Sequence, residues 1–143
     1  IVDALATPPG RGRDRALDRL DALLLRGPYS GLVSMGGPYY GNLALSRLRE
    51  EAGDLHRALA ASRRWPYFHG QPPYTAEFRL QEARLAERLG LDSAAVTAYR
   101  HFVDLQADAE PVRRARVDSA RARLTALLGA LDTIGSNAPA DGT

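Results

Sequence analysis

The side chains that most often carry out chemistry in proteins are few in this chain and lie far apart. Its three histidines are His56, His69 and His101, and cysteine is absent. None of the histidines belongs to a strong metal motif, in which a second ligand follows on the same helix face; His101 with Asp104 is the nearest case. The lack of cysteine excludes disulfides, thiolate metal sites and a cysteine nucleophile. We therefore expect no metal or catalytic role for the histidines.

The remaining catalytic patterns are not met either. The serines of the first 50 residues lack the Gly-x-Ser-x-Gly sequence that surrounds a hydrolase nucleophile. The glycine-rich segment 36–41 lacks the Gly-Lys-Ser/Thr ending of a phosphate-binding loop and follows no predicted strand. Acidic pairs such as Glu50 and Glu51 have arginines beside them, as solvated ion pairs on helices do. The chain is therefore predicted to be no enzyme and to bind no cofactor.

The basic residues suggest one alternative surface. All 19 of them are arginine, a bias that a high-GC coding sequence produces, and the formal net charge is only +2, which is small for a nucleic-acid-binding protein. The densest basic run contains Arg113, Arg114, Arg116, Arg121 and Arg123. These residues flank an apolar stripe, along which their stems can lie while their guanidinium groups stay in water. A surface that binds nucleic acid or another anion is the alternative.

The segment 63–69 (RRWPYFH) is the most suggestive local cluster. Tryptophan, tyrosine and arginine are the residues that dominate binding energy at protein interfaces. The alternative is that Trp65 and Phe68 fill the connection between two helices, because aromatic side chains bury large areas in small domains. The residues expected to contact a partner are Arg63, Arg64, Trp65, Tyr67, Tyr99 and Arg100.

Six amphipathic helices have to position these residues. Apolar residues at helical spacing, bounded by glycine, proline and capping residues, predict helices over 13–26, 39–52, 55–64, 75–89, 92–106 and 110–131. Thr75 and Asp92 are expected to be N-caps. No stretch reaches the ~18 apolar residues of a membrane span, and no sustained alternation predicts a strand. We expect a linker or disordered start over 1–12, a helical domain over 13–131 and a disordered tail over 132–143.

Comparison of the chain with itself reveals a repeat. The segment 50–63 aligns without gaps on 87–100, an offset of 37 residues, and glutamate, glycine, alanine and arginine recur at the same places. In each unit a helix, a glycine turn and a second helix follow one another. The glycine allows a left-handed backbone at the turn, and the alanine five residues later lets two helices approach closely. Helix hairpins that stack on one another are therefore predicted.

This pattern resembles the tetratricopeptide-repeat family. The family's glycine, small residue and aromatic fall on Gly90, Ala95 and Tyr99 in one unit and on Gly53, Ala58 and Ser62 in the other. The resemblance covers residues 39–107, and the period of 37 is longer than the usual ~34. It implies an all-α fold in which antiparallel hairpins stack as a short right-handed solenoid. The helix over 13–26 would be the second half of a truncated third repeat, and the helix over 110–131 would cap the last hairpin.

The resemblance also implies a function. Proteins of this kind hold partners together, so we expect a non-catalytic scaffold that binds a protein, a peptide or a neighbouring domain of its own parent chain. The segment 98–102 followed by 108–111 is similar to the repeat tails of large bacterial signalling proteins, among them serine/threonine kinases and transcriptional activators. A cytoplasmic regulatory context, a piece of a longer protein and self-association through an open end are further expectations, and no membrane partner is expected.

Overall fold

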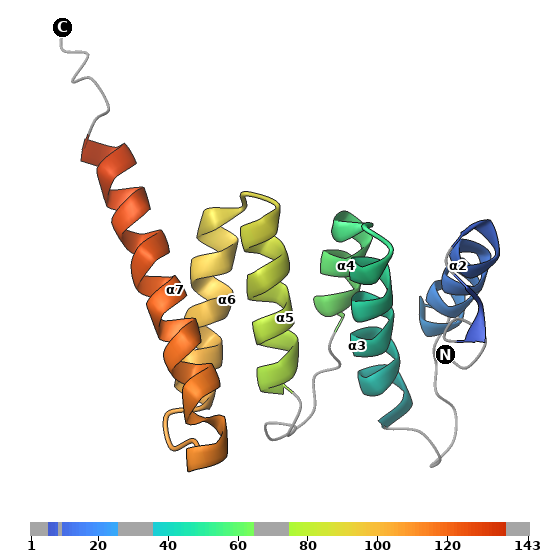
Figure 1. Ribbon diagram of the computed structural model, residues 1–143, viewed down its shortest axis with the longest axis horizontal. Helices are drawn as coiled ribbons and strands as arrows, with labels where there is room; N and C mark the ends of the chain where they lie inside the picture. Colours follow the sequence, from blue (N-terminus) through green and yellow to red (C-terminus); the bar gives the residue numbers. More distant parts are fainter. Residues whose placement is uncertain (1–5, 9, 26–35, 65–74, 137–143) are drawn as a thin grey trace, which may run out of the picture.

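The computed structural model describes residues 6–8, 10–25, 36–64 and 75–136, and this part of the chain is helical without a strand. The helices are α2 (Arg11–Leu25), α3 (Gly36–Glu51), α4 (Leu55–Ser62), α5 (Thr75–Arg88), α6 (Asp92–Leu105) and α7 (Pro111–Ser136). Figure 1 shows them standing side by side in chain order, from α2 at one end to α7 at the other. Each helix packs against the next one along the chain. The prediction of an all-α fold is confirmed.

The two repeat units close with the same turn. Gly53 and Gly90 have φ angles of 80° and 68°, which place both in the left-handed region. At the first turn the amide of Asp54 donates to the carbonyl of Arg49 at 2.9 Å, and at the second the amide of Leu91 donates to Ala86 at 2.9 Å. Together with the glycine amides, which donate three residues back, these bonds form two Schellman motifs 37 residues apart. The turn predicted from the sequence repeat is therefore a structural repeat as well.

Small residues lie buried where the helices cross. Ser46, Ala83 and Ala120 occupy equivalent positions of α3, α5 and α7 at successive offsets of 37 residues, and all are buried. Ala58 and Ala95 are their counterparts on α4 and α6, and both are completely buried. In the first hairpin the Ser46 hydroxyl donates to the Ala58 carbonyl at 2.8 Å, so the polar residue is satisfied where the second hairpin has alanine. In the 37-residue register, α7 corresponds to α3 and α5, which are the first helices of the two hairpins.

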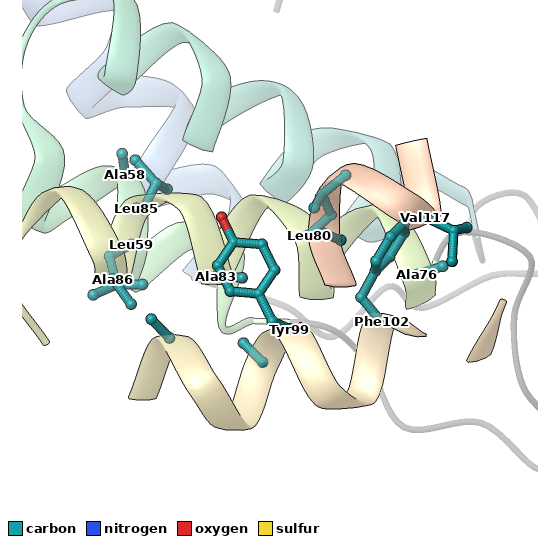
Figure 2. Packing of buried hydrophobic residues seen from close by; sticks show 13 residues of the cluster. Ala58, Leu59, Ala76, Leu80, Ala83, Leu85, Ala86, Tyr99, Phe102 and Val117 are labelled. Atoms are coloured by element: carbon teal, nitrogen blue, oxygen red, sulfur yellow. The ribbon is translucent and has the colours of Figure 1, made fainter. Parts of the chain in front are cut away.

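The apolar core consists of two clusters that meet at α4. The larger cluster is formed by α4, α5, α6 and α7, and Figure 2 shows Phe102 of α6 beside Val117 of α7 within it. The smaller cluster joins α2 to the first hairpin through Leu17 and Leu20 against Leu45. α4 contributes to both clusters, and four of its eight residues are buried, namely Ala58, Leu59, Ala61 and Ser62.

Several helix ends differ from the prediction. α2 begins at Arg11, within the segment 1–12 that was expected to be a linker or disordered. α3 begins at Gly36, earlier than expected, with Pro38 in the first turn, where its missing N–H breaks no helical bond. Neither predicted N-cap residue is one: Leu91 is the N-cap of α6 and Asp92 is its first residue, and Thr75 is likewise the first residue of α5. α7 continues to Ser136 and so includes residues expected in the tail; extending an existing helix costs far less than nucleating one.

No helix among the described residues is both long enough and apolar enough to span a membrane.

Candidate functional site

One face of the molecule is hollowed where α3, α5 and α7 follow one another. A hollow of about 580 Å³ lies between α5, α6 and α7 and is lined by Leu80, Arg84, Glu87, Arg88, Tyr99, Arg116, Ser119, Ala120 and Arg123. A second hollow of about 380 Å³ continues toward α3 and is lined by Arg47, Glu50, Glu51, Glu77, Leu80, Gln81, Arg84 and Arg116. Because Leu80, Arg84 and Arg116 line both, the two hollows adjoin each other. We call the two hollows together the groove.

Ion pairs connect the helices that line the groove. Arg116 of α7 binds Glu77 of α5 with two parallel hydrogen bonds, at 2.7 and 2.6 Å, and Arg47 of α3 approaches the same carboxylate at 3.4 Å. Glu50 of α3 accepts hydrogen bonds from Gln81, at 2.7 Å, and Arg88, both of α5. Glu50 therefore links α3 to α5, and Glu77 links α5 to both α3 and α7. These ion pairs set the distance between the walls of the groove. Most of the arginines are half exposed, so each pair contributes little to stability by itself.

The floor of the groove contains a buried tyrosine. Tyr99 of α6 is only 2% exposed, and its hydroxyl donates to a carboxylate oxygen of Glu87 at 2.8 Å. Arg123 of α7 pairs with the other oxygen of Glu87. Burial, together with the neighbouring Glu87 carboxylate, raises the pKa of Tyr99 to about 12. The tyrosine is thus a neutral, fixed part of the floor at physiological pH, and Figure 2 shows its side chain extending from α6 toward α5.

Arg84 differs from the other arginines of the groove. Among the described residues its ion pair is with Glu50 at 3.9 Å, beyond hydrogen-bond distance. That carboxylate already accepts bonds from Gln81 and Arg88. The side chain of Arg84 is 55% exposed and lines both hollows. Its guanidinium group is therefore available to an acceptor from a bound molecule.

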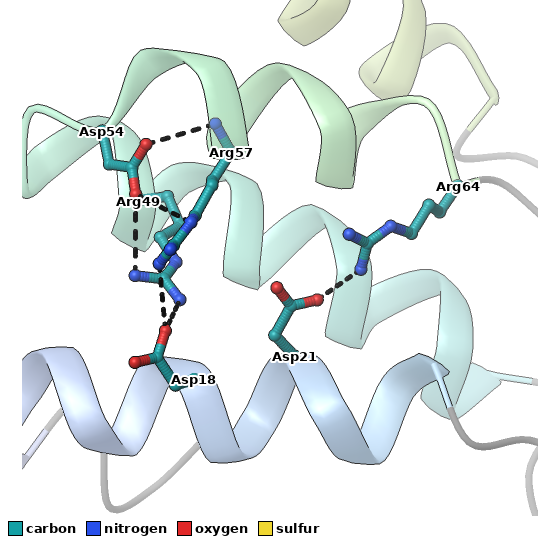
Figure 3. A network of polar contacts seen from close by, with 6 residues as sticks. All are labelled: Asp18, Asp21, Arg49, Asp54, Arg57 and Arg64. Atoms are coloured by element: carbon teal, nitrogen blue, oxygen red, sulfur yellow. Dashed lines mark hydrogen bonds and ion pairs between the residues drawn. The ribbon is translucent and has the colours of Figure 1, made fainter.

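A second polar network lies away from the groove and holds α2 on the first hairpin (Figure 3). Asp18 of α2 accepts hydrogen bonds from Arg49, at 2.5 Å, and Arg57, at 3.1 Å. Asp54 lies 3.7 Å from Arg49 and, as the N-cap of α4, also accepts from the amide of Arg57. The hydrogen bond from Arg49 holds the pKa of Asp18 below its ordinary value. This network is structural, because it joins elements of one chain.

Four of the six residues expected to bind a partner lie in the described structure, and they have different surroundings there. Arg63 donates to Glu82 at 2.8 Å, and Arg64 pairs with Asp21 of α2 while its carbonyl accepts from Asn42. Tyr99 is buried under the groove. Arg100 is exposed on α6 and does not line either hollow. Trp65 and Tyr67 lie outside the described residues.

The arginine run of α7 is largely engaged. Arg116 pairs with Glu77, Arg123 with Glu87 and Arg121 with Asp118. These contacts neutralise three of the five charges on which the nucleic-acid alternative depends. Histidines and carboxylates do not gather into a potential metal site anywhere in the described ranges.

No family model matches the chain, and neither a curated protein nor a solved structure is similar to it. Evidence for a function therefore comes from the residues and their geometry alone.

The groove was not predicted from the sequence, although the sequence contains a signal for it. Arg47 and Glu50 of the first unit correspond, at the offset of 37, to Arg84 and Glu87 of the second. All four line the groove. The signal is an arginine and a glutamate three residues apart, near the end of α3 and again, 37 residues later, near the end of α5. These residues do not form a cluster that is continuous in sequence.

Proposed function

We propose that this chain is a short tetratricopeptide-like solenoid that serves as a non-catalytic scaffold and holds a protein segment in the groove. The repeated Schellman turns and the buried small residues at the helix crossings support the solenoid. Stacking first helices side by side in such a repeat creates an extended concave surface, and here that surface is lined by α3, α5 and α7. The observation that carries the proposal is this groove, in which the half-exposed guanidinium group of Arg84 lies beyond hydrogen-bond distance of Glu50.

The partner is a peptide or a neighbouring domain of the parent chain, and the setting is a cytoplasmic regulatory protein of a bacterium. Protein recognition agrees with the arginines that line the groove, because arginine is enriched at protein interfaces. Nucleic acid is the weaker candidate. The carboxylates of Glu50, Glu77 and Glu87 stand among the arginines and would repel phosphates.

Site-specific photocrosslinking tests this proposal. The crosslinking amino acid p-benzoylphenylalanine is placed at Ser119, which is exposed and lines the groove, or at Ser93, which is exposed on α6 outside it. Each protein is irradiated in extract of a high-GC bacterium at low and at high salt. The same protein crosslinked from Ser119 at both salts, and not from Ser93, supports the scaffold. Nucleic acid crosslinked only at low salt, or equal crosslinking from the two positions, contradicts it.

A further inference from the structure

Three arginines form a stripe along the side of α2 that faces away from the rest of the row. Arg11, Arg15 and Arg19 follow one another at intervals of four residues, which places them on one face of the helix, and all three are exposed. The buried residues Leu17 and Leu20 lie on the opposite face, against the first hairpin. Figure 1 shows α2 at the end of the row, with α3 as its neighbour. Among the described helices, none therefore packs over the stripe.

The charges of the stripe are not neutralised within the described part of the chain. α2 contains four arginines and three aspartates. Three of these seven residues form ion pairs with the segment 49–64, namely Arg13, Asp18 and Asp21. The stripe and Asp14 remain, which gives three positive charges and one negative charge. The guanidinium groups of the stripe form no ion pair or hydrogen bond with another described residue.

Neighbouring helices of this chain are joined by arginine–carboxylate pairs as well as by apolar contacts. Such pairs connect α2 to α3 and connect α5 to both α3 and α7. A further helix beside the outer face of α2 would meet three unpaired guanidinium groups. It would be joined to α2 in the same way if it supplied the carboxylates.

We propose that the outer face of α2 docks an acidic helix of a partner protein. Carboxylates spaced by three or four residues on that helix lie along the stripe, where a guanidinium group can bind each of them through two parallel hydrogen bonds. Asp14, on one flank of the stripe, would repel a continuous run of phosphates, whereas a helix can place a neutral or basic residue beside it. This surface is separate from the groove, so the inference goes beyond the proposed function.

Two exposed leucines provide the apolar part of the docking surface. Leu23 and Leu25 are 66% and 62% exposed and lie at the C-terminal end of α2, one on either side of the stripe. Exposed ion pairs contribute little affinity, so most of it comes from apolar side chains of the partner that cover these leucines. The charges instead fix the direction and register of the docked helix.

Selection from a helix library tests the proposal. The exposed positions on one helix of a small, rigid helical carrier are randomised, and binders are selected on the wild-type chain. We expect the enriched helices to carry aspartate or glutamate at intervals of three or four residues, next to leucine, isoleucine or phenylalanine. Their dissociation constants are measured by fluorescence anisotropy.

Charge reversal assigns the binding to the stripe. Arg15→Glu should raise Kd about tenfold or more, because it replaces an attraction by a repulsion. Changing the facing glutamate of the binder to arginine should restore binding to this variant, which a purely structural role of Arg15 would not explain. Arg100→Glu is the matched control: it makes the same charge change at an exposed position of α6, outside the stripe and the groove, and should change Kd less than about twofold.

Two further variants test the leucines and the separation from the groove. Leu23→Ser should raise Kd about tenfold, because it removes apolar surface that the partner covers. Ser119→Trp fills the hollow between α5, α6 and α7 and should leave Kd unchanged. Circular dichroism confirms that each variant is folded as the wild type is.

The outcomes separate this inference from the proposed function. Enriched helices that are insensitive to Arg15→Glu would overturn it, and so would equal losses from Arg15→Glu and Arg100→Glu, because general electrostatic attraction would then explain the binding. Tighter binding to a short DNA duplex or to vesicles of phosphatidylglycerol, lost in Arg15→Glu, would assign the stripe to phosphates instead. Loss of binding in Ser119→Trp would place the helix in the groove and leave the scaffold standing without this second surface.

Discussion

Burial distinguishes two arginines that share one carboxylate. Arg49 and Arg57 both donate to Asp18, but the side chain of Arg49 is 3% exposed and that of Arg57 is 59% exposed. A buried guanidinium needs its partners, since nothing else replaces the water that it has lost. Its stem also fills space between α2 and the first hairpin, where an exposed arginine fills none.

We therefore expect Arg49→Ala to lower the free energy of unfolding by about 2 kcal/mol or more, through lost packing and lost hydrogen bonds. Arg57→Ala should cost less than about 1 kcal/mol, as exposed ion pairs usually do. Urea unfolding followed by circular dichroism measures both. Equal losses in the two variants would show that burial is not what gives Arg49 its role.

The raised pKa of Tyr99 makes stability depend on pH in alkaline solution. The pKa is about 12 in the folded chain and 10.0 in an unperturbed tyrosine. The folded state therefore keeps a proton that the unfolded state loses, and stability falls as the pH rises through this interval, by up to about 1.4 kcal/mol per pH unit. Below pH 10 the full contribution is present.

Glu87→Gln should weaken this effect, because it removes the carboxylate that helps to raise the pKa of Tyr99. The pKa should move toward 10.0, and the alkaline loss of stability should become smaller. Titration of tyrosinate absorbance, in parallel with thermal unfolding at each pH, measures both quantities. The chain contains no lysine and no cysteine, and its five other tyrosines are present in both proteins, so the difference between the two titration curves reports Tyr99. An unchanged titration curve in the variant would contradict the assigned cause.

At the scale of the element, the two hairpins depend on their turns. Gly53 and Gly90 have positive φ angles, and a Cβ at either position would meet no neighbour within 4 Å. A substitution at either glycine is therefore destabilising because of the backbone conformation, and not because the new side chain would clash with other residues. Left-handed backbone costs an L-residue roughly 1–2 kcal/mol.

Gly53→Ala and Gly90→Ala should each destabilise the chain by about 1 kcal/mol. Gly129→Ala is the matched control, because Gly129 lies within α7, has no positive φ and also has open space at its Cβ. It should stabilise the chain by up to about 1 kcal/mol, the helix-propensity difference between alanine and glycine. Thermal unfolding of the three variants gives the comparison. A stabilising Gly90→Ala would refute the Schellman assignment at that turn.

The whole molecule is a row of helices, so its parts differ in how many neighbours support them. α5 and α6 pack against each other and against a further helix on their outer sides, within the larger core cluster. α2 stands at the end of the row and is held by the smaller cluster and by ion pairs. In linear arrays each element is stabilised mainly by its nearest neighbours.

Hydrogen exchange followed by mass spectrometry should therefore show a gradient. Amides of α5 and α6 should be the most protected, and those of α2 should exchange through local opening at a lower free energy. Raising the salt concentration should widen the difference by screening the ion pairs of α2. Uniform protection from α2 to α7 would instead show a single cooperative unit.

Much of this arrangement was predictable because its signals are local. The six helices, the glycine turns and the 37-residue offset follow from spacing that the printed sequence contains, and the structure confirms the helices and both turns. The start of α3 and the end of α7 were placed wrongly, since helices fray or extend without a strong sequence signal. The tetratricopeptide-like solenoid and its handedness, the partner and the setting remain predictions.

The sequence by itself determined which segments are helical, where the hairpins turn and which residues repeat, because each of these depends on the backbone preferences of neighbouring residues. Only the tertiary structure decided which arginines are available. In the folded chain, Arg116 and Arg123 are paired with glutamates of α5, and Arg49 is buried. Arg84 is half exposed and lies beyond hydrogen-bond distance of Glu50. Such differences come from residues far apart in the chain that packing brings together, and the electrostatic and solvation energy of a charge depends on that surrounding.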